Sequence, residues 1–154
     1  MSLTVEIPGR TPLVLEHLLI DQNGTLTNRG ALIDGVAARL TRLRAHLDAH
    51  VLSADTFGTL DQLADELRIE TQRVKTGAEK RAFLERLGAR RCVAVGNGVN
   101  DEPMLREAAL SIAVIGPEGA SAWPLLAADV ICTSIVHALD LLLDPRLLVA
   151  TLRS

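Results

Sequence analysis

Apolar segments of two kinds alternate along the chain. Short, nearly continuous apolar runs predict strands that are buried on both faces of a sheet, at residues 16–21, 51–55, 91–98, 110–116 and 129–133. A further short strand is predicted at 68–71, "RIET". Between the strands, apolar residues recur every three or four positions, which indicates amphipathic helices at 35–50, 58–69, 77–88, 101–109, 119–128 and 134–153.

This alternation predicts an α/β fold: a central, mostly parallel sheet between two layers of helices. The chain has 154 residues, which suits one domain, so residues 1–154 are expected to form a single unit. Pro124 is expected to interrupt the helix at 119–128, and Pro145 to divide the closing helix.

Composition excludes several classes of protein. Aromatic residues make up 2% of the chain, the net charge is −3 and no basic stretch occurs, which argues against a nucleic-acid surface. The apolar runs are too short to cross a bilayer, so no membrane segment is expected. Cys92 and Cys132 lie inside apolar runs and outside any CxxC motif, which favours buried, reduced thiols and a cytoplasmic location. The histidines lack zinc-motif spacing.

Polar side chains follow several of the predicted strands. Asp21, Asn23 and Thr25 follow the first strand, and Ser53 and Asp55 end the second. A third group, with Lys80 on the helix before its strand, contains Gly96, Asn97, Gly98, Asn100 and Asp101. Because parallel strands share one carboxyl edge, these groups are expected to converge there. Such a set suits phosphoryl transfer: a carboxylate can attack phosphorus, and oxygen ligands can hold Mg²⁺.

Four segments carry a family resemblance. "DQNGTLT" (21–27) resembles the Asp-x-Asp-Gly-Thr motif of the haloacid dehalogenase (HAD) superfamily, and "VLSAD" (51–55) its second motif. Lys80 fits the third motif, and "VAVGNGVNDEPML" (93–105) resembles the fourth. Motifs one and four also look like those of the P-type ATPase phosphorylation domain. The segment 113–153 is similar to soluble P-type-ATPase-like HAD proteins. The resemblance extends from about Val5 to Arg153.

The resemblance implies a three-layer Rossmann-like HAD fold and a Mg²⁺-dependent phosphatase in which Asp21 is the nucleophile. The implied catalytic residues are Asp21, Asn23, Ser53 and Lys80. The implied phosphate-binding residues are Asp21, Gly24, Thr25, Ser53, Ala54, Lys80 and Asn100. The implied Mg²⁺ ligands are Asp21, the backbone carbonyl of Asn23, Asn97 and Asp101.

Two positions depart from the family pattern. Most phosphatases of the family have a second aspartate where this chain has Asn23, and a carboxylate near the metal where it has Asn97. An amide is no general acid or base near neutral pH, so breakdown of an aspartyl-phosphate is expected to be slow. Asp55 is a candidate substitute base. The alternative function is an impaired HAD-fold binding or regulatory module, which binds Mg²⁺ or phosphate or keeps a stable aspartyl-phosphate. A third interpretation is a relative of the pump phosphorylation domain.

Simpler interpretations of the same residues stay open. Residues 21–24 also match a plain turn, and Asp101 and Asp55 also match helix caps. Lys75 competes with Lys80 for the place in the third motif.

No cap domain fits between the motifs. The intervals 22–52 and 54–79 are already filled by predicted elements, so the site is expected to be open. An open site admits a small or macromolecular phosphorylated substrate, or takes a lid from another subunit of a homo-oligomer. The apolar segment 138–152 belongs either to such an interface or to a helix packed on its own sheet.

Overall fold

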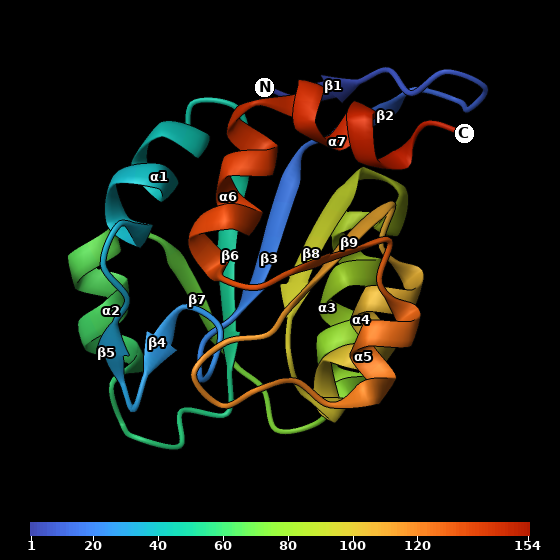
Figure 1. Ribbon diagram of the computed structural model, residues 1–154. Coiled ribbons are helices and arrows are strands. Elements are labelled where there is room, and N and C mark those ends of the chain that lie inside the picture. The colour runs from blue at the N-terminus through green and yellow to red at the C-terminus, as the bar shows by residue number, and fades with distance from the viewer.

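The computed structural model describes all residues, 1–154, and shows a central sheet of six parallel strands in the order β10–β9–β8–β3–β6–β7 (Figure 1). All five strand pairs of this sheet are parallel, which confirms the α/β prediction. From the central strand the chain first adds strands on one side and then on the other, so the order reverses beside it. The strands are β3 (His17–Asp21), β6 (Asp48–Ser53), β7 (Glu70–Arg73), β8 (Cys92–Gly96), β9 (Leu110–Val114) and β10 (Val130–Cys132).

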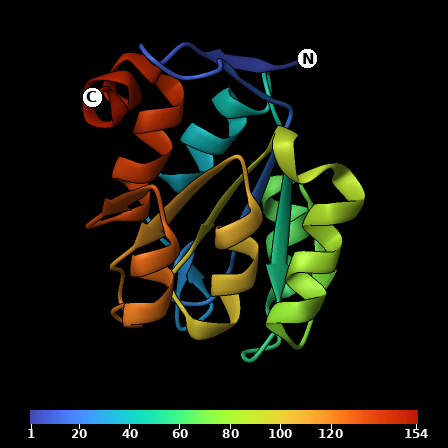
Figure 2. The same cartoon turned by 90° about the vertical axis from the view of Figure 1, so that its right-hand side faces the viewer.

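Helices cover both faces of the sheet (Figures 1 and 2). One layer contains α1 (Val36–Leu43), α2 (Leu60–Leu67), α6 (Ile135–Leu143) and α7 (Pro145–Leu152). The other layer contains α3 (Gly77–Leu87), α4 (Glu102–Glu107) and α5 (Ala122–Ala127). Short 3₁₀ turns at Ala89–Arg91 and Val99–Asp101 flank β8.

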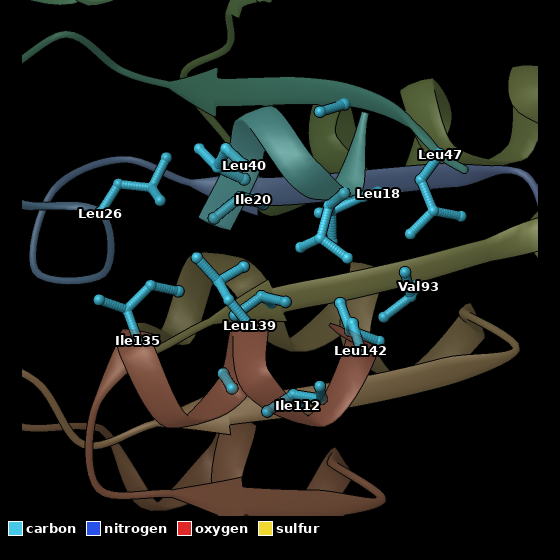
Figure 3. Packing of buried hydrophobic residues seen from close by; sticks show 14 of the residues in the cluster. Leu18, Ile20, Leu26, Leu40, Leu47, Val93, Ile112, Ile135, Leu139 and Leu142 are labelled. Atoms are coloured by element: carbon cyan, nitrogen blue, oxygen red, sulfur yellow. The ribbon is translucent and has the colours of Figure 1, made fainter. Parts of the chain in front are cut away.

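Side chains on the two faces of β3 belong to two separate hydrophobic clusters. Leu18 and Ile20 point to the larger cluster, where Figure 3 shows them near Leu40 and Leu139. Leu19 lies in the smaller cluster under α3 and α4. All three leucine and isoleucine side chains of β3 are fully buried, because a strand covered on both faces has apolar residues at successive positions.

The fold contains two antiparallel hairpins that were not predicted from the sequence. The first, β1 (Leu3–Val5) and β2 (Leu13–Leu15), packs against α7. The second, β4 (Thr27–Asn28) and β5 (Ala31–Leu32), directly follows the turn after β3. Strands of two or three residues are too short to show a two-residue period.

The helix predicted at 35–50 was too long. It ends at Leu43, and β6 already begins at Asp48. Leu43 and Leu47 have the spacing of neighbours on one helix face, and both are buried. Leu43 lies in the helix, however, and Leu47 lies in the turn that follows it. The backbone of residues 48–52 pairs with β3 in the sheet. These residues therefore form a strand, although their apolar spacing locally favours a helix.

Proline has different effects in the two C-terminal helical regions. Pro124 does not interrupt its helix, because it lies in the first turn of α5, where a backbone N–H has no intrahelical partner. Pro145 divides the closing segment as predicted and begins α7. Leu139, Leu142 and Leu148 are buried in the larger cluster, so segment 138–152 packs on its own sheet.

No separate cap domain stands over the sheet. The interval after Asp21 holds only the β4–β5 hairpin and α1, and the interval after Ser53 holds α2 and β7. Both cysteines are buried and unpaired, as predicted. None of the helices has the length and apolar character that a membrane crossing requires.

Candidate active site

Asp21 ends the central strand β3, at the point where the strand order reverses. Its carboxylate lines a cavity of about 340 Å³ at the carboxyl edge of the sheet. In open α/β sheets this is the edge where ligands bind. The residues around the cavity are Asp21, Asn23, Ala54, Thr56, Phe57, Asn97, Gly98, Asn100 and Glu118.

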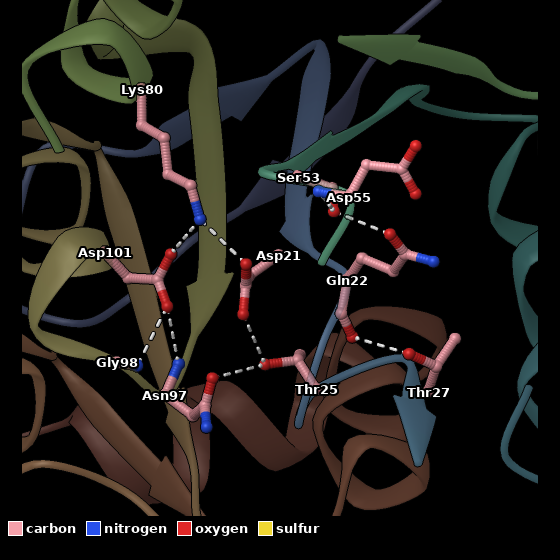
Figure 4. Close-up of polar contacts among 10 residues, drawn as sticks. All are labelled: Asp21, Gln22, Thr25, Thr27, Ser53, Asp55, Lys80, Asn97, Gly98 and Asp101. Carbon is pink, nitrogen blue, oxygen red and sulfur yellow. Dashed lines mark hydrogen bonds and ion pairs between the residues drawn. The ribbon is translucent and has the colours of Figure 1, made fainter. Parts of the chain in front are cut away.

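Lys80 reaches the site from α3 and joins two carboxylates (Figure 4). Its Nζ lies 2.7 Å from Oδ1 of Asp21 and 2.7 Å from Oδ1 of Asp101. The Lys80 side chain is fully buried and in contact with both carboxylates, whereas Lys75 is exposed. Thr76 begins α3 by accepting the Glu79 N–H, which sets the helix that carries Lys80.

The Asp21 carboxyl and the Lys80 amine shift each other's pKa. Burial, reinforced by the charge of Asp101, raises the pKa of Asp21 to about 7 although Lys80 opposes the shift. Burial lowers the pKa of Lys80, but the charges of Asp21 and Asp101 outweigh burial and raise it overall. Lys80 is therefore a permanent cation beneath the cavity.

The turn after β3 is folded around one carbonyl. The Gln22 carbonyl accepts N–H bonds from Thr25, Leu26 and Thr27. Gly24 occupies the left-handed region at φ 76°, which glycine adopts without strain. The Thr25 hydroxyl lies 3.4 Å from Oδ2 of Asp21 and 3.2 Å from Oδ1 of Asn97, and its single proton serves one of them at a time.

Asp101 lies beneath the cavity and does not line it. Its Oδ2 accepts the backbone N–H groups of Asn97 and Gly98, each at 2.9 Å, while Oδ1 faces Lys80. Gly96 permits this packing, because a Cβ there would collide with the Asp101 carboxylate. Among the four predicted metal ligands, Asp21, Asn23 and Asn97 line the cavity.

Ser53 is held away from the cavity by Gln22. Its hydroxyl donates to Oε1 of Gln22 at 2.6 Å and accepts the N–H of Asp55 at 2.9 Å. The next residue, Ala54, lines the cavity. Gln22 is fully buried and also donates to Thr59 at 3.0 Å.

Asp55 has a structural role in this arrangement. Its Oδ1 accepts the N–H of Leu60 at the start of α2, and its Oδ2 pairs with Arg73 at 3.2 Å. Both oxygens are therefore engaged away from Asp21, and Asp55 does not line the cavity. The cap interpretation fits these contacts, and the substitute-base interpretation does not.

Three cavity residues were absent from the sequence analysis: Thr56, Phe57 and Glu118. Thr56 and Phe57 follow β6, and Glu118 lies in the loop after β9. The rule that found the other residues, polar groups directly after a strand, would also have found Glu118. Asn23, which was predicted, has a buried side-chain oxygen without a hydrogen-bond partner.

The chain is similar in sequence to an archaeal protein from Methanocaldococcus jannaschii. No protein-family model matches the chain. The uncharacterized protein MJ0073 of Methanocaldococcus jannaschii is 41% identical over 92 residues, which cover 55% of this chain and 99% of that protein.

Solved structures share the fold at low sequence identity. A Streptomyces avermitilis protein assigned to the HAD family of hydrolases has a TM-score of 0.69 at 21% identity, covering 86% of this chain and 93% of its own. The 3-deoxy-D-manno-octulosonate 8-phosphate phosphatase of Moraxella catarrhalis, in complex with magnesium, phosphate and the sugar acid, has a TM-score of 0.65 at 18% identity, covering 90% and 94%. A phospho-aspartyl intermediate analogue of phosphoserine phosphatase has a TM-score of 0.69 at 14% identity, covering 82% and 98%.

Proposed function

Because the chain belongs to one family with the Methanocaldococcus jannaschii protein and has the haloacid dehalogenase fold, we propose that it is a Mg²⁺-dependent phosphohydrolase acting through an aspartyl-phosphate on Asp21. The observation that carries this proposal is the placement of Asp21. Its carboxylate faces the cavity at the end of the central strand and is held from behind by Lys80 at 2.7 Å. A carboxylate fixed in this way is suited to nucleophilic attack on phosphorus.

The reaction has two steps. First, an oxygen of Asp21 forms a bond to phosphorus while the bond between phosphorus and the leaving oxygen breaks. Lys80 favours the ionised form of Asp21, and the hydroxyl of Thr25 is within reach of the same carboxylate. Second, water attacks phosphorus, the bond to Asp21 breaks and inorganic phosphate leaves. The phospho-aspartyl analogue of the structurally similar phosphoserine phosphatase supports this route.

The side chains of the cavity suit a magnesium ion. Oxygen atoms are available on the carboxylates of Asp21 and Glu118 and on the amide of Asn97, and Asn23 lines the same cavity with a buried side-chain oxygen. These are the hard ligands that Mg²⁺ prefers, and the Asn23 oxygen has no other partner. No three His, Cys, Asp or Glu side chains group closely enough to bind a metal by themselves, so amide and backbone oxygens would contribute. When bound, Mg²⁺ neutralises phosphate charge. The magnesium and phosphate bound to the Moraxella enzyme support this assignment.

Asn23 makes the second step slow. An amide neither protonates the leaving oxygen nor takes a proton from water near neutral pH. General acid–base help contributes roughly 10²–10⁴-fold in rate, and Asp55 is engaged elsewhere. A long-lived phospho-enzyme follows, as the resemblance to the P-type-ATPase-like group also implies.

The substrate class follows from the open cavity. With no cap over it, the site accepts a phosphomonoester or phosphoanhydride on a small molecule or a macromolecule. A lid from a second subunit remains a prediction.

The second candidate function is a module that takes up phosphate or a phosphoryl group without turnover. The contact between Ser53 and Gln22 favours it, because the hydroxyl expected to hold phosphate is engaged by another side chain at 2.6 Å. Turnover requires that Ser53 rotate towards the substrate or that other groups replace it.

Intact mass and phosphate release, measured together, test the proposal. Wild type, Asp21→Asn and the exposed control Asp65→Asn are incubated with Mg²⁺ and a reactive small phosphodonor. We expect a phosphoryl adduct and slow phosphate release in wild type and Asp65→Asn, and neither in Asp21→Asn. Equal signals from wild type and Asp21→Asn would contradict the proposed function. An adduct that never releases phosphate would favour the module.

A further inference from the structure

The cavity carries negative charge that the chain does not neutralise. Its only charged lining residues are Asp21 and Glu118. The one cation nearby is Lys80, which is buried and shared between Asp21 and Asp101. With the carboxylates ionised, Asp21, Glu118 and the buried Asp101 carry three negative charges against the one positive charge of Lys80. Phosphate, itself an anion, would be repelled unless a divalent cation entered with it.

Glu118 has an exposed side chain that reaches over the turn that follows β3. Its loop is a tight turn in which the Gly119 N–H bonds the Gly116 carbonyl at 2.9 Å. Gly116 packs against the carbonyl of Gly24, where any side chain at position 116 would collide. The Glu118 carboxylate lies against Gly24: its Oε2 would be 2.5 Å from a Cβ built there. Yet this carboxylate makes no hydrogen bond and no ion pair within the chain.

Asn97 ties the same loop to the site. Its Nδ2 donates to the Gly119 carbonyl at 3.2 Å, and its Oδ1 faces the Thr25 hydroxyl. That Nδ2 would also lie 2.7 Å from a Cβ at Gly24, so the amide of Asn97 and the carboxylate of Glu118 meet at one point. A carboxylate at position 97 would face the Gly119 carbonyl and lose this bond. The amide at position 97 therefore bonds the loop, and the loop brings a carboxylate of its own.

We propose that Glu118 is a direct ligand of the divalent cation, and that it supplies from the loop after β9 the negative charge that Asn97 does not carry. This inference rests on the proposed function and adds a residue to its metal site. Asp21 and Glu118 are the charged ligands, and the backbone carbonyl of Asn23 and the amide oxygen of Asn97 complete the set. Three carboxylates with Lys80 leave two negative charges, which a divalent ion balances.

Binding of Mn²⁺, a paramagnetic substitute for Mg²⁺, tests this inference without any turnover. Free Mn²⁺ is measured by electron paramagnetic resonance during titration of wild type, Glu118→Gln, Asp21→Asn and the control Glu66→Gln. Glu66 is exposed on α2 and makes no hydrogen bond or ion pair. We expect Glu118→Gln to weaken Mn²⁺ binding roughly tenfold or more, because a charged ligand is lost, and Glu66→Gln to leave it unchanged. Urea unfolding without metal should be the same for wild type and Glu118→Gln.

The outcomes separate this inference from the proposed function. Unchanged Mn²⁺ affinity in Glu118→Gln, together with loss of binding in Asp21→Asn, overturns the role of Glu118 and leaves the phosphohydrolase standing. Weaker binding that is matched by a loss of metal-free stability assigns Glu118 to loop structure and also overturns the inference. A wild type that binds no Mn²⁺ overturns both the Glu118 site and the Mg²⁺ dependence. The phosphoryl adduct on Asp21 is then the independent measure of the chemistry.

Discussion

The Nζ of Lys80 lies 2.7 Å from Oδ1 of Asp21 in an ion pair whose lysine is completely buried. The pair joins the end of the central strand β3 to helix α3, and Asp101 adds a second carboxylate at the same distance. A buried cation between two carboxylates is strongly coupled to both folding and chemistry, because removal of the cation leaves two buried carboxylates uncompensated.

Lys80→Met should destabilise the fold. The two carboxylates would remain buried without their cation, at a cost of about 3–5 kcal/mol in the free energy of unfolding near pH 8. Lys75→Met is the matched control, since Lys75 is exposed, and should change stability by less than about 0.5 kcal/mol. Urea unfolding of the three proteins measures the difference, and equal midpoints for wild type and Lys80→Met would contradict the buried pair.

Asp21→Asn should be more stable than wild type at pH 8, by a margin that shrinks towards pH 4. The pKa of Asp21 is raised by burial to about 7 in the folded chain, above its value of 3.8 when unperturbed. A raised carboxyl pKa contributes stability that is present below the unfolded pKa and is lost as the pH rises through the folded pKa. Wild type therefore loses stability between about pH 4 and pH 7, and the neutral variant does not.

Urea unfolding in the presence of a chelator, at pH 4.5 and pH 8, checks this pH dependence. The chelator removes divalent cations that would otherwise bind the ionised Asp21. The opposite result would be a wild type whose free energy of unfolding rises relative to that of Asp21→Asn as the pH rises. The pKa of Asp21 would then be lowered, and the charge of Lys80 would outweigh the effect of burial.

Asn23→Asp should speed the breakdown of the phospho-enzyme. The new carboxylate can take a proton from the attacking water, so hydrolysis should rise by roughly 10²–10⁴-fold. The decay of the adduct, followed by intact mass after removal of the phosphodonor, measures this step. Asn28→Asp is the control, since Asn28 is exposed on β4. Unchanged decay in Asn23→Asp would show that the missing acid does not limit the reaction.

Gln22→Met and Ser53→Ala should have opposite effects on adduct formation. If the Ser53 hydroxyl leaves Gln22 to hold the phosphoryl group, Gln22→Met frees it and formation is kept or accelerated. Ser53→Ala then slows formation by about tenfold, the value of one lost hydrogen bond to a charged group. Both variants remove the 2.6 Å bond and should lose roughly 1–3 kcal/mol of stability. Equal rates of adduct formation in both variants would restrict Ser53 to a structural role.

The regular parts of the fold were predictable from local pattern. Continuous apolar runs identified β3, β8 and β9, and helical spacing identified α3 with little error in its bounds. The boundary between α1 and β6 was not predictable, because residues 48–52 form a strand only through pairing with β3. The hairpins β1–β2 and β4–β5 were missed for the same reason: their stability comes from packing and pairing.

For the site, local sequence was enough to predict which residue types stand at the ends of which strands. Asp21, Thr25, Lys80 and Asp101 could be grouped in advance, because parallel strands bring their carboxyl ends to one edge. Which of these groups face the cavity and which face one another depends on the packing of the folded chain. Asp101 bonds backbone N–H groups beneath the cavity, Ser53 bonds Gln22, and the carboxylate of Glu118 lies against Gly24. Side-chain direction depends on partners that are distant in sequence, so periodicity and spacing, which are local, carry no record of it.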